Sequence, residues 1–294
     1  GFLMTVAYLM RFTNLINRFK RRTKSFELPG KRLSGSFMFL YLGVMLVIPL
    51  ALLVWHLTAA TPEKILHTLQ NPRVLAAFQV TVVTAFFAAL VNLVFGTLIA
   101  WVQVRYRYPG QTLVSMLIDL PFALPTAVAG IALTATFSNQ SLVGRWLHDM
   151  GIQITYTPLG IAIAMVFIGI PFVIRHVEPV LEELGSEMEE AAAMLGATAW
   201  QRFRRITLPN LIPAALAGFT SAFARGLGEY GSVIFISGNM PFRTEVVSLL
   251  IVSKLEQFDY TGAVIIATGM LALSLFFLLI SNGLQYWQKQ RLGI

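Results

Sequence analysis

The sequence predicts an all-α membrane protein with six transmembrane helices and one long cytoplasmic loop. Its 294 residues are 56% hydrophobic and only 12% charged, whereas a soluble domain is about one quarter charged. The mean hydropathy is +0.70. Apolar runs of about 20 residues, the length that a helix needs to cross a bilayer, recur along the chain. The sequence has no cysteine, which excludes disulfides, thiol chemistry and thiolate metal sites.

The chain begins with a basic, amphipathic segment, residues 1–35, which we expect on the cytoplasmic side. Apolar residues recur at near-helical spacing from Phe2 to Phe19, and a basic cluster follows at 18–24. A secretory signal peptide has the opposite order, with basic residues before the apolar core. We interpret residues 1–25 as an interfacial helix on an anionic membrane leaflet. A disordered basic tail is the alternative.

Residues 36–285 form the predicted six-helix transmembrane domain, and residues 286–294 form a short cytoplasmic tail. The predicted spans are residues 36–57, 78–104, 112–137, 158–177, 212–237 and 263–285. The loop before the last span contains the apolar stretch VVSLLIV at 246–252, which is too short to cross a bilayer. Two interpretations fit this stretch: a re-entrant or interfacial segment, and a hairpin packed on the outer face.

The distribution of basic residues predicts the orientation of the chain. With the N-terminus in the cytoplasm, sixteen of the 22 Lys and Arg residues fall in inside segments and five in outside loops, and Arg225 lies within a span. The positive-inside rule therefore places both termini and residues 178–211 in the cytoplasm. A net charge of +8 can also accompany nucleic-acid binding. The apolar runs instead indicate membrane lipid as the partner, and we expect no nucleic acid.

The cytoplasmic loop at 178–211 is predicted to form two short helices with a sharp bend between them. Three alanines at 191–193 favour helix. Gly196 can adopt the left-handed conformation that ends a helix, and Pro209 suits the first turn of the next span. A loop of this length in a compact membrane protein usually has a function.

This loop resembles the EAA motif of bacterial ABC importer permeases. The shared pattern is Glu190-Ala191-Ala192, three residues, Gly196, nine residues, and then Ile206-x-Leu208-Pro209. In that family the motif forms a coupling helix that inserts into a groove on an ATPase subunit. The resemblance implies a type I ABC importer permease fold. It implies an ATPase-coupling role for Glu190, Ala191, Ala192, Gly196, Leu208 and Pro209. A helical hairpin that only braces the spans is the alternative.

ATP-driven transport would need its energy source on another chain, because the sequence contains no G-x-x-x-x-G-K-[ST] phosphate loop. The resemblance implies two cytoplasmic ATPase subunits that hold ATP and Mg, so we expect no cofactor and no enzymatic activity in this chain. It also implies a second permease subunit, usually a related but different chain. A periplasmic or other extracytoplasmic anion-binding protein completes the implied set of partners.

Three further stretches resemble the T subunit of sulfate/thiosulfate permeases: DLPFALPTAVAG at 119–130, FARGLGEYGSVIFISGN at 223–239 and TEVVSLLIVSKLEQFDY at 244–260. The resemblance extends from about residue 70 to the last span and leaves out the first 35 residues. Molybdate and tungstate permeases resemble the same core, and sulfate and molybdate are both tetrahedral dianions, so molybdate or tungstate import stays open. The combined match favours ATP-driven sulfate/thiosulfate import across the bacterial inner membrane.

Charged residues inside predicted spans mark a candidate anion pathway. A charge at the bilayer centre costs about 2.5–3.5 kcal/mol, so Asp119, Arg225 and Glu229 should face the protein interior or water. Arg225 and Glu229 lie four residues apart, share one helix face and can form an ion pair. Arg225 can donate to two anion oxygens, while Glu229 weakens the attraction. Asp119 and Thr126 are further pathway candidates. Alternatively, the pair is a packing clamp that holds its helix against Asp119 or a partner subunit.

Two other classes of transport protein stay open from sequence. A proton-coupled secondary anion transporter would use Asp119 and Glu229 as a proton relay, and a passive channel would conduct without partners. The loop at 190–209 argues against the proton-coupled class, which has no need of an ATPase dock. The four histidines lack the spacing of metal ligands, so we expect no metal site.

Overall fold

The computed structural model describes residues 31–58 and 60–292, and every regular element in these ranges is a helix. This confirms the all-α prediction. The predicted interfacial helix at 1–25 lies outside the described residues. The chain divides into two units, residues 1–55 and 56–294, which are described separately.

The described residues of the first unit, 31–55, form one nearly continuous helix. It comprises α2 (Lys31–Leu42), a π-helical turn (Gly43–Val47) and most of α3 (Ile48–Thr58). Residues Leu33–Thr58 are long and apolar enough to cross a membrane, with a hydropathy of 2.7. This helix coincides with the predicted first span at 36–57.

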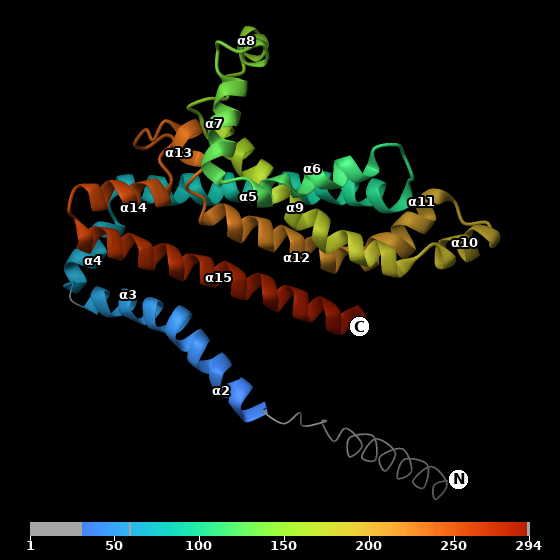
Figure 1. Ribbon diagram of the computed structural model, residues 1–294, viewed down its shortest axis with the longest axis horizontal. Coiled ribbons are helices and arrows are strands. Elements are labelled where there is room, and N and C mark those ends of the chain that lie inside the picture. The colour runs from blue at the N-terminus through green and yellow to red at the C-terminus, as the bar shows by residue number, and fades with distance from the viewer. Residues whose placement is uncertain (1–30, 59, 293–294) are drawn as a thin grey trace, which may run out of the picture. The chain divides into compact units, whose positions relative to one another are not determined.

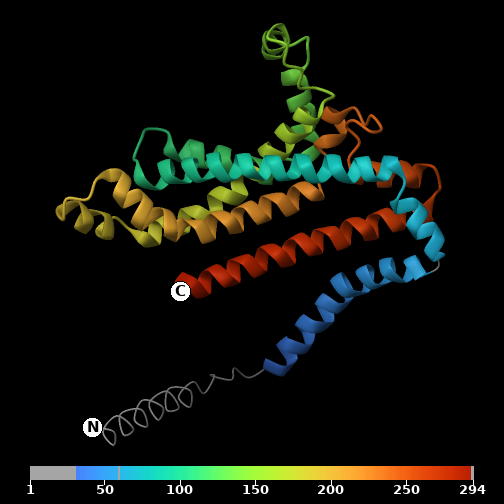
Figure 2. The same ribbon diagram turned by 180° about the vertical axis from the view of Figure 1, so that it is seen from behind.

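Three long helices form the centre of the second unit: α5 (Pro72–Arg105), α9 (Pro158–Leu184) and α12 (Leu208–Leu227). They pack against one another, and Figures 1 and 2 show them side by side. Alanines 77, 85, 88, 89 and 100 of α5 are buried in this core. Small side chains let helix backbones approach closely, which is the main source of packing energy between helices in lipid.

The predicted third span at 112–137 is not one straight helix. The structure has α6 (Gln111–Ala123) and α7 (Thr126–Phe137), bent by 113° at the break between them. Pro125 has no N–H to donate, and it forces the preceding Leu124 into an extended conformation, with ψ at 136°. In Figure 1, α7 leads away from the layer of α5, α9 and α12 towards α8 (Leu142–Asp149).

The predicted fifth span at 212–237 is wrong at both ends. Helical structure begins earlier, with α11 (Ala199–Arg202) and a π-helical turn (Phe203–Thr207) before α12. It stops at Leu227, and α13 (Val233–Ser237) is a separate short helix. The interruption begins at Gly228, which caps α12 and is followed by a turn.

The last part of the chain is a helical hairpin of α14 (Val247–Glu256) and α15 (Tyr260–Leu292). The apolar stretch at 246–252 begins α14, where Val247, Leu249 and Leu250 are buried. Because α14 packs against α5 and α15, the structure favours the packed hairpin over an interfacial segment. Before it, α4 (Pro62–Leu69) packs on α15.

Candidate functional site

The loop that contains the EAA-like motif folds as predicted into two short helices with a sharp bend. The helix α10 (Glu187–Met194) ends in a Schellman motif, in which Ala197 N–H donates to Ala192 O at 3.0 Å and Gly196 N–H donates to Ala193 O at 2.9 Å. Gly196 has φ +85°, a conformation that costs a residue with a Cβ atom. The glycine therefore fixes the angle between α10 and α11.

One face of α10 is exposed. Glu190 and Ala191 are exposed, and the Glu190 carboxylate makes no hydrogen bond or ion pair with any residue that the structure describes. Beyond them, Met194 and Leu195 are 85% and 89% exposed. Large apolar side chains exposed next to an unpaired charge are typical of a protein-binding surface. Sequence reasoning missed Met194 and Leu195, although an apolar pair directly before a helix-ending glycine is a usable signal.

The opposite side of α10 is attached to the helix bundle through Glu189, which the sequence did not single out. Its Oε1 lies 3.2 Å from Arg105 Nη2 and accepts a 2.7 Å hydrogen bond from Thr207 Oγ1. Arg105 is the last residue of α5, and Thr207 is buried directly before α12. We call these three residues the Glu189 clasp. It ties α10 to the ends of two central helices.

Aromatic packing supports the clasp. The ring of Phe203 meets Trp101 of α5 edge-on and stacks on Trp200 of α11, each at 5.6 Å between ring centres. The Arg105 guanidinium lies 5.8 Å from the Trp101 ring centre, within the range of a cation–π interaction.

Leu208 and Pro209 lie at the start of α12 and are half-buried. Pro209 cannot donate the backbone hydrogen bond that would continue an α-helix. The preceding turn is π-helical, and Leu208 N–H donates to Phe203 O across it. The two residues therefore shape the base of the loop and do not belong to its exposed face.

The predicted ion pair between Arg225 and Glu229 is confirmed, with 2.7 Å between Arg225 Nη1 and Glu229 Oε2. The prediction that the two residues share a helix face is wrong, because α12 ends at Leu227 and Glu229 lies in the following turn. The Glu229 side chain is 2% exposed and that of Arg225 is 36% exposed. The pair therefore presents the guanidinium and conceals the carboxylate.

Glu229 also organises the turn after α12. Its Oε1 accepts hydrogen bonds from the backbone N–H and the hydroxyl of Ser232, both at 3.0 Å. Ser248 Oγ of α14 donates to the Glu229 carbonyl at 2.6 Å. The buried carboxylate thus has a structural role in addition to pairing with Arg225.

Thr126 lies against this turn. A Cβ atom on Gly231 would be 2.2 Å from Thr126 Oγ1, so only glycine permits this approach. Thr126 is the first residue of α7, next to the 113° break. The N-terminus of α7 therefore lies beside the turn that follows α12 and contains Glu229.

Asp119 belongs to a different cluster. Its carboxylate pairs with Arg175, with Nε to Oδ1 at 2.9 Å, and Arg175 Nη1 also lies 2.6 Å from Glu178 Oε2. This cluster links α6 to α9. The suggestion that Arg225 and Glu229 hold their helix against Asp119 is wrong, because the partner of Asp119 is Arg175. The one guanidinium of the cluster is already paired with two acidic side chains, so it offers no free positive charge to an anion.

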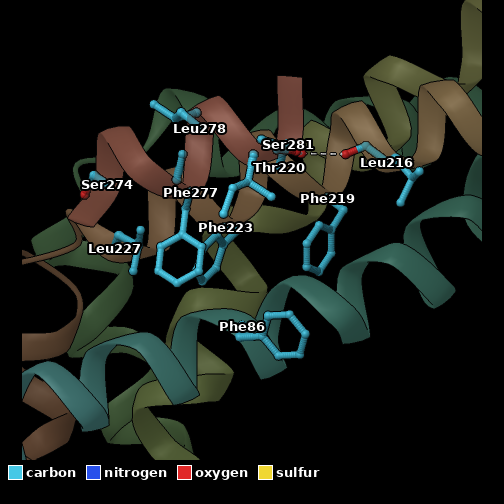
Figure 3. A pocket seen from close by; sticks show the side chains of 12 residues that line it. Phe86, Leu216, Phe219, Thr220, Phe223, Leu227, Ser274, Phe277, Leu278 and Ser281 are labelled. Carbon is cyan, nitrogen blue, oxygen red and sulfur yellow. Dashed lines mark hydrogen bonds between the residues drawn. The ribbon is translucent and has the colours of Figure 1, made fainter. Parts of the chain in front are cut away.

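An apolar hollow of about 230 Å³ lies beside α12, between α5 and α15 (Figure 3). Its side chains include Phe86, Phe219, Phe223 and Phe277, and none of its described lining residues is charged. The polar side chains among these lining residues are hydroxyls, two of which, Thr220 and Ser281, contact each other. An anion would lose its hydration there without replacement donors, so this hollow is not part of an anion pathway.

The fold and these sites define a class of protein: a multi-span helical membrane protein with an exposed helical hairpin at one end of its central bundle. Residues 92–294 match the family described as the binding-protein-dependent transport system inner membrane component, and the chain belongs to this family.

Similar relatives share most of the chain. The sulfate transport system permease protein CysT of Escherichia coli (strain K12) is 51% identical over 258 residues, which cover 88% of this chain and 93% of the relative. The corresponding protein of Synechocystis sp. is 45% identical and covers 85% of this chain and 88% of the relative.

A solved structure shares the fold. It belongs to a bacterial ABC transporter involved in the import of the acidic polysaccharide alginate, with a TM-score of 0.70 at 17% identity, covering 93% of this chain and 98% of that chain. The predicted type I ABC importer permease fold is thereby confirmed.

Proposed function

We propose that this chain is a permease subunit of an ATP-driven sulfate/thiosulfate importer in the bacterial cytoplasmic membrane. The observation that carries the proposal is the 51% identity to a sulfate transport permease over 88% of the chain. No binding site for nucleotide is proposed on this chain. ATP hydrolysis, with its ATP and Mg, takes place on a separate subunit.

The proposed complex contains a second, related permease subunit, two cytoplasmic ATPase subunits and an extracytoplasmic sulfate-binding protein. Both termini and α10 face the cytoplasm, as the excess of basic residues on that side supports. In a solved relative of the same fold, an alginate ABC transporter is in complex with its periplasmic protein.

Coupling to the ATPase is proposed for the exposed face of α10. Glu190 offers an ion-pair partner, Ala191, Ala192 and Gly196 permit close approach, and the exposed side chains of Met194 and Leu195 supply apolar area. The Glu189 clasp then transmits displacement of α10 to the ends of α5 and α12, because it contacts both.

The anion pathway is proposed to pass the partly exposed guanidinium of Arg225. Glu229 neutralises part of its charge, so that the site holds a dianion weakly and releases it. Thr126 stays a pathway candidate, because it lies against the same turn. Asp119 contributes no attraction, since it is acidic and its partner Arg175 is already shared with Glu178.

Reconstitution of the complete complex in proteoliposomes tests the proposal. We expect ATP-dependent uptake of radioactive sulfate that requires the binding protein, and stimulation of ATP hydrolysis by sulfate-loaded binding protein. Stimulation by molybdate but not sulfate would reassign the substrate. Uptake driven by a proton gradient without ATP, or conductance by this chain alone, would refute the proposed class.

A further inference from the structure

A polar hollow of about 720 Å³ lies at the end of α9 that is opposite to α10. The 27 residues of α9 separate the two regions by about 40 Å, at a rise of about 1.5 Å per residue. Two loops form the hollow, one before α9 and one between α13 and α14. Its lining comprises Gln153, Tyr156, Thr157, Pro158, Gly238, Met240, Arg243 and Thr244.

The polar hollow carries a positive charge that no carboxylate in its described lining neutralises. Among the described residues that line it, Arg243 is the one charged residue and none carries a carboxylate. The exposed Arg243 side chain makes no hydrogen bond or ion pair with any residue in the described part of the chain. The neighbouring Glu245 is already neutralised, because Arg73 donates to both of its carboxylate oxygens at 2.8 and 2.7 Å. The guanidinium therefore remains available to a negatively charged ligand.

Further donors point to the same class of ligand. The buried Thr244 hydroxyl accepts from Met240 N–H at 3.1 Å, which leaves its own hydrogen free to donate. The amide of Gln153 donates to Thr155 O at 3.3 Å with one of its two hydrogens. The hollow also includes the first turn of α9, whose partial positive charge favours anions. A guanidinium, a hydroxyl, an amide and a helix N-terminus together suit an oxyanion.

The backbone around the polar hollow is held in a defined shape. Tyr156, Asn239 and Phe242 have φ values of 63°, 47° and 64°, which non-glycine residues rarely adopt. Tyr156 N–H donates to Ile236 O at 2.8 Å and joins the loop before α9 to α13. Such conformations persist where the surrounding structure enforces them, and they cluster at binding sites.

We propose that the polar hollow is an entry site for a hydrated tetrahedral oxyanion on the extracytoplasmic side of the membrane. The inference rests on the proposed function and its orientation. A volume of about 720 Å³ accommodates an anion that retains part of its water shell, so binding is weak and exchange is fast. The site receives the anion from the binding protein before it reaches Arg225.

Equilibrium binding of radioactive sulfate to the purified complex in lipid nanodiscs, without the binding protein, tests the entry site. The Arg243→Gln variant should weaken sulfate binding by about tenfold, because charge-assisted hydrogen bonds are lost. The Arg243 side chain has no partner among residues 31–58 and 60–292, so the variant should fold normally. The matched control is Arg145→Gln, which removes an exposed arginine of α8 outside the hollow and should leave binding unchanged.

Several outcomes would overturn the entry site: no sulfate binding by the unmodified complex, normal binding by Arg243→Gln, or an equal loss in Arg145→Gln. Weaker affinity for the loaded binding protein with unchanged sulfate binding would make the hollow a protein-docking site instead. Sulfate uptake by the unmodified complex is measured in parallel. If uptake is intact while Arg243→Gln binds sulfate normally, the entry site fails and the proposed function stands. If Arg243 is needed for binding but the complex imports no sulfate, the proposed function fails and the anion site stands.

Discussion

Removal of the Glu189 carboxylate should uncouple ATP hydrolysis from transport without preventing assembly of the complex. The carboxylate is the common partner of Arg105 at the end of α5 and of Thr207 before α12. Its loss frees α10 from both helices. The exposed face of α10 is unchanged by the substitution, so the ATPase should still bind.

The magnitude follows from the two contacts. The Glu189 and Arg105 side chains are 20% and 16% exposed, so their ion pair is stronger than a surface pair of about 0.2–1 kcal/mol. A hydrogen bond to a charged group contributes about 1.5–3 kcal/mol. Glu189→Gln can keep the Thr207 contact and should weaken attachment of α10 by about 1 kcal/mol, or about fivefold. Glu189→Ala loses both contacts and should weaken attachment by about 2 kcal/mol, or about 30-fold.

The assay is the number of sulfate ions imported per ATP hydrolysed by the reconstituted complex. Hydrogen exchange of the α10 amides reports attachment directly and should be faster in both variants. Glu183→Gln is the matched control, because Glu183 is an exposed carboxylate on the last turn of α9 with no described partner. Unchanged transport per ATP in Glu189→Ala, despite faster exchange in α10, would refute the transmission role of the clasp.

Three further predictions concern single positions. Gly196→Val should cost about 1–2 kcal/mol at φ +85° and reduce ATPase binding, measured by co-purification. Arg225→Lys keeps the charge beside Glu229 but loses the planar donor fork of the guanidinium. Sulfate uptake should therefore fall about tenfold while the complex assembles normally. Uptake at the unmodified rate would exclude Arg225 from the pathway. Lys254 and the Gly262 N–H lower the pKa of Asp259. The stability that this gives is complete above the unfolded pKa of about 3.9 and is lost as pH falls through the lower folded pKa. Thermal unfolding should therefore show Asp259→Ala destabilised at pH 7, with a smaller deficit at pH 3.

Local sequence signals predicted the loop and the ion pair because their determinants are local. The helix-ending conformation of Gly196 depends on backbone sterics, and its Schellman bonds join residues three and five apart. The Arg225–Glu229 contact needs only a spacing of four residues. The position of Pro209 in the first turn of α12 follows from its missing N–H.

The missed features depend on residues distant in sequence. Glu189 meets Arg105 across 84 positions, and Asp119 meets Arg175 across 56, so no local pattern distinguishes these partners from other charged residues. The hydropathy of residues 112–137 and 212–237 shows continuous apolar runs, whereas Pro125 and Gly228 interrupt the helices within them. Hydropathy measures transfer to lipid and is insensitive to a single residue that changes the backbone direction.

The central helix α5 connects the proposed coupling surface with the proposed entry site. Its last residue, Arg105, pairs with Glu189 of α10, and its second residue, Arg73, pairs with Glu245 beside the polar hollow. Its 34 residues span about 50 Å at a rise of about 1.5 Å per residue. A rigid helix held by an ion pair at each end can carry displacement from the ATPase to the loop that contains Arg243.

Glu245→Gln should therefore reduce stimulation of ATP hydrolysis by the loaded binding protein. The Arg73 side chain that remains is 34% exposed and can be hydrated, so loss of its charge-assisted contact costs about 1.5–3 kcal/mol, and normal assembly of the complex must be checked first. A double-mutant cycle isolates the connection. The measured quantity is the change in free energy calculated from the sulfate transported per ATP. The effects of Glu189→Gln and Glu245→Gln should deviate from their sum by more than about 0.5 kcal/mol when the two are combined. The effects of Glu189→Gln and Asp259→Asn should add. Since transmission through α5 needs both of its ends, additivity in the first pair would show that the two ion pairs act independently and that displacement takes another route.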